Sequence, residues 1–171
     1  MRKKILFMVP LPPPVHGSGM VCLQILQSAK INADFDCRYV NLSTSRGNGE
    51  VAGFTPLLLP KKLGRFIASF LRSFWLLVVF RPQTCYVAIA CRGVGFLKDA
   101  PFVLLARMFG CKIILHQHNK GMSGYVNRWL YGWLLPIVYR HATVILLSWR
   151  LYDDISAVVQ KEQVRICPNG I

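Results

Sequence analysis

Residues 3–19 read KKILFMVPLPPPVHGSG, and they set an order of elements that the rest of the chain repeats. The apolar run at 3–9 predicts a strand, the prolines of 10–14 predict a loop, and the small residues of 17–19 come where a helix must begin. Backbone N–H groups point outward at a helix N-terminus and carry partial positive charge, so anions and polar ligands collect there. We therefore expect this turn to contribute to a ligand site.

The size and hydropathy of the chain indicate one domain with a substantial core. The chain has 171 residues, of which 53% are hydrophobic. The charge-free centre of its most apolar segment, 73–80, is far shorter than the roughly 18 residues that cross a bilayer. Basic residues at 2–4 resemble the start of a signal peptide, but the apolar run ends at Pro10 without a small-residue cleavage site. We expect no signal peptide.

The charge of the chain is strongly positive and unevenly distributed. The net charge is +14, and residues 51–152 contain 13 basic residues and a single acid, Asp99. Ordinary protein surfaces mix both signs, so a one-sided field favours an anionic partner such as phospholipid headgroups, nucleic acid or a phosphorylated substrate. A basic protein without such a partner is the alternative.

Apolar runs and amphipathic segments alternate along the whole chain. Besides 3–9, strands are predicted at 35–42, 84–90, 112–115, 142–147 and 163–167. Helices are predicted at 19–30, 61–81, 99–109, 126–138 and 149–160. Residues 43–53 have the composition of a loop. Six strands separated by helices predict an α/β fold with a doubly wound, Rossmann-like parallel sheet.

The 61–81 helix has the clearest periodicity. Its apolar positions recur at helical spacing: Leu63, Phe66, Ile67, Phe70, Leu71, Phe74, Trp75 and Val78. The segment has basic residues and no acid, which suits a helix that packs on the sheet and also suits contact with a bilayer surface. Both roles are compatible, because apolar residues at 76, 77 and 80 widen the apolar arc.

Polar or glycine-rich loops follow three predicted strands, at 10–19, 91–95 and 116–121. Ligands bind outside the carboxyl ends of strands in open parallel sheets, so we expect these loops to converge on one crevice. His116 and His118 lie two residues apart on an extended segment and should point to the same side. At least one is expected to reach a ligand, and a structural role is the alternative for each. A metal site is not expected, because no third ligand is near.

Several familiar motifs are missing from these loops. Cys22 stands where a G-x-G-x-x-G fingerprint needs its third glycine, and no Lys–Ser/Thr pair completes a P-loop. The glycines at 17 and 19 are therefore expected to let a bound group approach the backbone. A G-x-S-x-G nucleophile elbow is also missing. The six cysteines form no C-x-x-C pair, so buried free thiols are expected rather than zinc.

Taken together, these features resemble the N-terminal domain of retaining glycosyltransferases of family 4, which have the GT-B fold. The resemblance rests on the proline/glycine loop, the segment IILHQH at 113–118, the strand at 143–148 and the closing VRICPNGI at 164–171. It covers essentially the whole chain. It implies an N-terminal domain at 1–168 and the start of an interdomain linker at 169–171. The family's E-x7-E motif and its donor-binding domain have no counterpart in these 171 residues.

The resemblance also implies roles for particular residues. The domain would hold the acceptor, and a sugar nucleotide would lie in a cleft between two domains. A histidine after the fourth strand would act at the reacting sugar, with His118 preferred and His116 as the alternate. Donor or substrate contacts would come from His16, Gly17, Ser18, Gly19, Arg92, Gly93, Asn119, Lys120 and Asn169. No metal and no cofactor are implied; the sugar nucleotide is a co-substrate.

We therefore expect the acceptor-side domain of a hexosyltransferase-like enzyme of polysaccharide biosynthesis, with a lipid-linked or polysaccharide acceptor. It should be inactive without a second GT-B domain, from the same or another chain. The charge and the apolar helices suggest a cytoplasmic protein, peripheral on the anionic inner face of the cell membrane. The alternative is a non-enzymatic α/β module that binds membrane or polyanion. A nucleic-acid partner is disfavoured because the aromatic residues lie on helical stripes.

Overall fold

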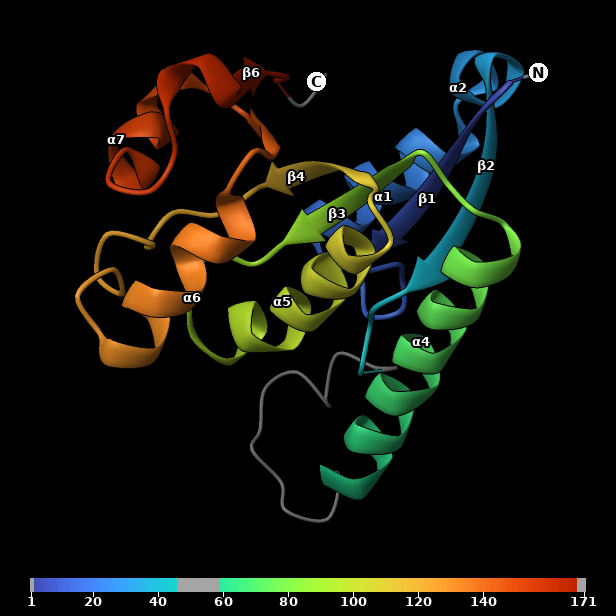
Figure 1. Cartoon of the computed structure of the whole chain (residues 1–171), viewed down its shortest axis with the longest axis horizontal. Coiled ribbons are helices and arrows are strands. Elements are labelled where there is room, and N and C mark those ends of the chain that lie inside the picture. The colour runs from blue at the N-terminus through green and yellow to red at the C-terminus, as the bar shows by residue number, and fades with distance from the viewer. Residues whose placement is uncertain (1, 46–58, 169–171) are drawn as a thin grey trace. The chain divides into compact units, whose positions relative to one another are not determined.

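A computed structural model describes residues 2–45 and 59–168 of the chain (Figure 1). The chain divides into two compact units, Met1–Gln83 and Thr84–Ile171. Each unit has its own parallel strands and its own helices.

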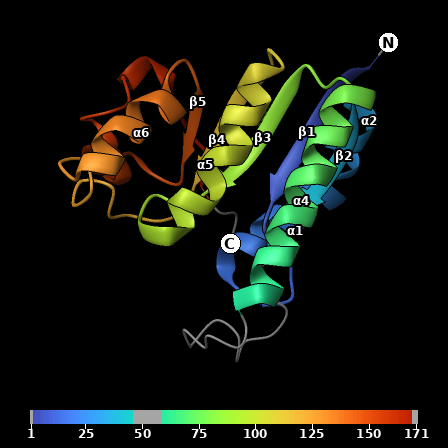
Figure 2. The same cartoon turned by 60° about the horizontal axis from the view of Figure 1, so that its bottom comes forward.

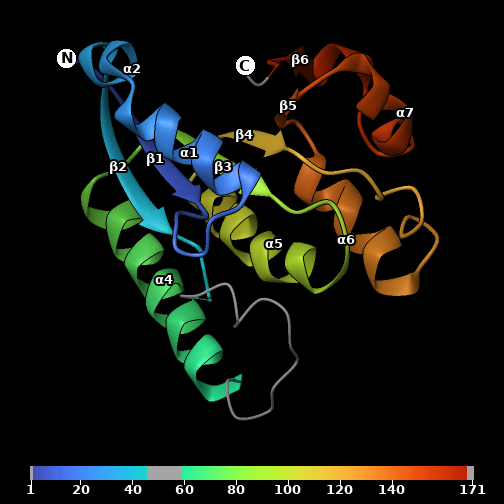
Figure 3. The same ribbon diagram turned by 180° about the vertical axis from the view of Figure 1, so that it is seen from behind.

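The first unit is built on a pair of parallel strands. Its elements are β1 (Lys3–Val9), α1 (Gly17–Gln27), α2 (Ala29–Asp34), β2 (Phe35–Asn41) and α4 (Leu59–Val79). β1 and β2 pair along their whole length, with Lys3 opposite Phe35 and Val9 opposite Asn41. α4 lies on one face of this pair and α1 on the other (Figures 2 and 3). The carboxyl ends of both strands therefore open towards the same edge of the unit.

α1 differs from the predicted helix at both ends. It begins at Gly17 because the Nδ1 atom of His16 accepts the backbone N–H of Gly19 at 3.0 Å and caps the first turn. It stops at Gln27 because Ser28 adopts an extended backbone conformation and caps α2 instead. The single helix predicted at 19–30 is therefore wrong, and two short helices replace it.

The second unit has four strands. Its elements are β3 (Thr84–Ile89), α5 (Gly93–Met108), β4 (Lys112–Gln117), α6 (Trp129–Tyr139), β5 (Thr143–Leu146), η2 (Trp149–Leu151), α7 (Tyr152–Ile155), η3 (Lys161–Gln163) and β6 (Val164–Ile166). The strands pair in parallel, β3 with β4, β4 with β5 and β5 with β6. β3 is almost wholly buried, as a continuous apolar run predicts, and α5 packs on β3 and β4.

The fold class is confirmed. The described residues form six strands, each parallel to its partners, with helices between them, which is the predicted α/β, doubly wound, Rossmann-like architecture. β4 runs two residues further than predicted, so His116 lies inside the strand and His118 directly follows it. The helix predicted at 149–160 is reduced to the short turns η2 and α7.

α5 begins six residues before the predicted start. Pro101 lies in the interior of the helix. The positive φ of Gly93, +59°, lets the chain turn from β3 directly into the helix. The Oδ2 atom of Asp99 accepts the N–H of Ala90 at 3.0 Å and ties the helix to the end of β3. These contacts explain why the helix begins at Gly93, well before Pro101.

Both apolar helices leave large side chains in solvent. α4 buries Ser73, Leu76 and Leu77 and exposes a stripe of apolar residues on another side: Leu59, Leu63, Ile67, Leu71, Phe74, Trp75 and Val78. α6 buries Leu134, Leu135, Val138 and Tyr139, whereas Trp129 is 89% exposed. Within residues 2–45 and 59–168, no helix has the length and apolar character needed to cross a bilayer.

Candidate functional site

The carboxyl ends of β3 and β4 bring two of the predicted loops together. Ile89 lies opposite Gln117, so the chain leaves both strands at the same level. The side chain of Arg92, which follows β3, lies on Gly121, which follows β4. A Cβ atom on Gly121 would come within 2.8 Å of the Cδ atom of Arg92. The loops 91–95 and 116–121 therefore meet, as predicted, and the loop 10–19 belongs to the other unit.

The two histidines at the end of β4, His116 and His118, form a close pair of tilted rings. Their ring centroids are 4.0 Å apart, so both rings point to the same side, as predicted. His116 is 2% exposed, and its Nδ1 atom shares a hydrogen bond with the hydroxyl of Tyr86, whose direction depends on the tautomer. Its Nε2 atom has no hydrogen-bond partner in the described part of the chain. His118 is partly exposed and is the more accessible of the two.

Burial holds His116 in its neutral form. Loss of contact with water, and then the charge of His118, lower the pKa of His116 from 6.5 to about 4. At neutral pH this ring carries no charge, so it is a poor proton donor. The close contact between the two rings suits His116 to hold the His118 ring in place.

Gln117 fixes the direction in which the chain leaves β4. The hydroxyl of Tyr139 donates to Oε1 of Gln117 at 2.9 Å, and Nε2 of Gln117 donates to the carbonyl of Asn119 at 3.0 Å. Both side chains are completely buried. Sequence reasoning missed this pair, although a glutamine inside an otherwise apolar strand was an available signal.

Asp154 is the second group that sequence reasoning missed. Its Oδ2 atom accepts the N–H groups of Gly121 at 2.7 Å and Met122 at 2.9 Å. Its Oδ1 atom accepts the N–H of Ser123 at 3.2 Å and the hydroxyl of Ser123 at 2.8 Å. Burial alone would raise the pKa of Asp154, but these hydrogen bonds outweigh it and leave the pKa below its usual value. An ionised carboxylate therefore anchors the loop beyond His118.

The other predicted residues of this unit surround the same edge. Arg92 caps α5 without a side-chain hydrogen bond to the helix, and its side chain is exposed. Gly93 provides the left-handed turn into α5. Asn119 and Lys120 are exposed just beyond His118. Two cationic side chains and the first turn of a long helix thus belong to the same two loops as His118, an arrangement that suits an anionic ligand.

Part of the glycine loop of the first unit forms the N-terminal cap of α1. Nδ1 of His16 also lies 3.1 Å from the hydroxyl of Ser18, so both residues belong to the cap of α1. A Cβ atom on Gly19 would come within 2.8 Å of the His16 ring. The cap itself therefore needs a glycine at position 19, and a ligand contact at this residue stays a prediction. Gly17 has open space around it, and Asn169 lies outside the described residues.

Metal ligands and cysteine thiols are the remaining candidates for chemistry in this chain. No group of three or more histidine, cysteine, aspartate or glutamate side chains that could hold a metal ion occurs in residues 2–45 and 59–168. All six cysteines are free; Cys22, Cys85 and Cys91 are buried as expected, whereas Cys167 is exposed.

Comparisons with known proteins add no assignment. A scan against models of protein families gives no match. Searches of curated proteins and of solved structures find no similar protein. The function therefore has to be argued from the site itself.

Proposed function

We propose that the chain is the acceptor-side domain of a glycosyltransferase that resembles family 4 and transfers a sugar from a sugar nucleotide to a lipid-linked or polysaccharide acceptor. The observation that supports this proposal is the edge formed by β3 and β4. There, the side chain of Arg92 lies on Gly121, in the loop that carries His118 and Lys120 and that Asp154 anchors at residues 121–123.

In this proposal the edge binds the donor. Its diphosphate carries negative charge, which the guanidinium of Arg92 and the ammonium of Lys120 complement. His118 contacts the sugar that is transferred, and His116 is a positioning residue that supports His118 through the contact between their rings. An acceptor oxygen forms the new bond to the anomeric carbon while the bond to the diphosphate breaks and the nucleoside diphosphate leaves. Retention at that carbon, without a metal or cofactor, follows from the resemblance.

Full activity in this proposal needs a second GT-B domain, from the same or another chain. One domain supplies only part of the groups that position the donor, and positioning is a large part of the rate enhancement of such enzymes. We place the protein in the cytoplasm, peripheral on the inner face of the cell membrane. The exposed apolar stripe of α4, together with the basic residues of that helix, supports this location.

The same stripe supports the alternative function, a non-enzymatic α/β module that binds a membrane or polyanion. The two functions differ in one respect. A glycosyltransferase domain must recognise a sugar nucleotide through the β3–β4 edge, whereas a membrane-binding module has no use for one.

Calorimetric titration with UDP-glucose and GDP-mannose tests the proposed function. We expect saturable binding of at least one donor, weakened about tenfold or more in His118→Asn, a loss of about 1.4 kcal/mol. His141→Asn is the matched control, because His141 is an exposed histidine of the same unit outside this edge. Absence of binding at millimolar concentrations, or equal weakening in both variants, would sink the donor assignment.

A further inference from the structure

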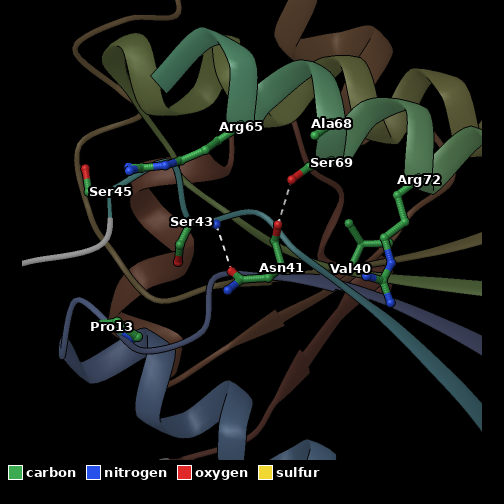
Figure 4. A pocket seen from close by; sticks show the side chains of 9 residues that line it. All are labelled: Pro13, Val40, Asn41, Ser43, Ser45, Arg65, Ala68, Ser69 and Arg72. Carbon is green, nitrogen blue, oxygen red and sulfur yellow. Dashed lines mark hydrogen bonds between the residues drawn. The ribbon is translucent and has the colours of Figure 1, made fainter. Parts of the chain in front are cut away.

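The first unit contains a pocket that the proposed donor site does not use. It has a volume of about 520 Å³ and lies beside the carboxyl end of β2, between the proline loop and α4 (Figure 4). Its lining residues are Pro13, Val40, Asn41, Ser43, Ser45, Arg65, Ala68, Ser69 and Arg72. A volume of this size is within the usual range for small-molecule sites.

The walls of the pocket are tied together by hydrogen bonds. Oδ1 of Asn41 accepts the N–H of Leu11 at 3.1 Å and the N–H of Ser43 at 2.9 Å. The hydroxyl of Ser43 donates to the carbonyl of Leu11 at 2.9 Å. The hydroxyl of Ser69, on α4, donates to the carbonyl of Asn41 at 2.9 Å. The strand end, the proline loop and the helix therefore form the pocket without a ligand.

The charged side chains among the described lining residues, Arg65 and Arg72, are both positive. Arg65 and Arg72 are two turns apart on α4, about 10 Å along its axis, and Figure 4 shows Ser69 between them. Nη1 of Arg65 donates to the carbonyl of Thr44 at 2.7 Å, which holds this side chain at the pocket. Arg72 has no hydrogen-bond or ion-pair partner within the described residues. Among the described residues that line the pocket, none is acidic.

Two guanidinium groups, with no carboxylate among the described lining residues, match the chemistry of phosphate. Guanidinium binds phosphate oxygens with two parallel hydrogen bonds, whereas the hydroxyls of Ser43 and Ser69 already donate to carbonyls of the pocket wall. A carboxylate ligand would use the same donors, but two arginines spaced along the pocket favour a group with more charge and more oxygens. The volume leaves room for a ring next to a phosphoryl group.

We propose that this pocket binds a phosphoryl group, either a phosphomonoester or a diphosphate, carried by the acceptor. The assignment to an acceptor rests on the proposed function, whereas binding of the phosphoryl group by Arg65 and Arg72 stands without it. The phosphate can come from a soluble sugar phosphate or from the headgroup of a lipid. On α4 the arginines and the exposed apolar stripe occupy different sides of the helix, so phosphate binding and membrane contact can be measured separately.

The test is a titration with pyrophosphate, glucose 1-phosphate and soluble dihexanoyl phosphatidic acid, followed by calorimetry. We expect saturable binding of at least one probe, weakened at least tenfold in Arg72→Gln. Arg72→Lys should recover part of the affinity, because it keeps the charge and loses the two-bond geometry. Since Arg72 has no partner within the described residues, Arg72→Gln should unfold at the wild-type temperature.

Lys30→Gln is the matched control, because it removes the same charge from an exposed position on α2 in the same unit. It should bind the probes as the wild type does. Equal binding by wild type and Arg72→Gln, or equal weakening by Arg72→Gln and Lys30→Gln, would overturn the pocket assignment. The probe that binds most tightly identifies the source of the phosphate. In Arg72→Gln, sugar-nucleotide binding that depends on His118 should persist, so failure here leaves the donor assignment standing.

Discussion

Replacing Asp154 by asparagine keeps the shape of the side chain and removes its charge. In the wild type the carboxylate accepts four hydrogen bonds from residues 121–123, two on each oxygen. An amide has a single acceptor oxygen, so two of these bonds are lost and an NH2 group faces backbone N–H donors. Hydrogen bonds to charged groups contribute roughly 1.5–3 kcal/mol each, so we expect a loss of about 3 kcal/mol or more in the free energy of unfolding.

Urea unfolding measures the total loss, and amide hydrogen exchange locates it. We expect the amides of Gly121 and Met122 to exchange much faster in Asp154→Asn. The control is Asp153→Asn. Asp153 is the neighbouring residue and is exposed, so this variant removes the same charge from a side chain in solvent. It should change the free energy of unfolding by less than about 0.5 kcal/mol. Equal losses in the two variants, or unchanged exchange at the two amides, would refute the anchoring role of Asp154.

Three further predictions follow from the fold. The pKa of His116 in the folded state, about 4, lies below its ordinary value of 6.5. The contribution of this residue to the free energy of unfolding is therefore complete above pH 6.5 and falls by about 3 kcal/mol as the pH drops to 4. Urea unfolding at several pH values should show a smaller decline in His116→Gln than in the wild type, and equal declines would contradict the lowered pKa of His116. Gly19→Ala should lower the free energy of unfolding by about 1 kcal/mol by displacing the His16 cap, whereas Gly17→Ala should be neutral or stabilising; thermal unfolding of both variants checks the order, and the reverse order would count against the cap. The double variant Leu71→Ser with Trp75→Ser should lose sedimentation with anionic vesicles at low salt; sedimentation of the wild type that is no better with anionic than with neutral vesicles would argue against membrane contact by α4.

Strands could be predicted from the sequence because their signal is local. A continuous apolar run such as 84–89 suits a strand covered on both faces, and the structure buries it there. The convergence of the loops after β3 and β4 was also predictable, since parallel strands end at the same edge. The spacing of the two histidines predicted that both rings point to the same side of the chain. In the structure the ring centroids are 4.0 Å apart, which agrees with this prediction.

The features that sequence reasoning missed depend on contacts between distant residues. Asp154 lies more than thirty residues from the loop it anchors, and nothing near it in sequence marks that role. The cap of α1 was missed because histidine is an uncommon cap residue. The buried face of α6 could not be predicted, because apolar spacing alone does not say which part of a wide apolar arc is buried. Leu135 and Tyr139 are buried, whereas Trp129 is exposed.

One NMR titration tests the central claim, that the β3–β4 edge binds a sugar nucleotide. The chain has four histidines, so the ring Cε1–H signals of His16, His116, His118 and His141 can be followed in one spectrum. On addition of UDP-glucose or GDP-mannose, we expect a saturable shift of the His118 signal, a smaller one at His116 because the two rings are in contact, and none at His141. A titration in which His118 does not move with either donor, or in which all four signals move alike, would contradict the account.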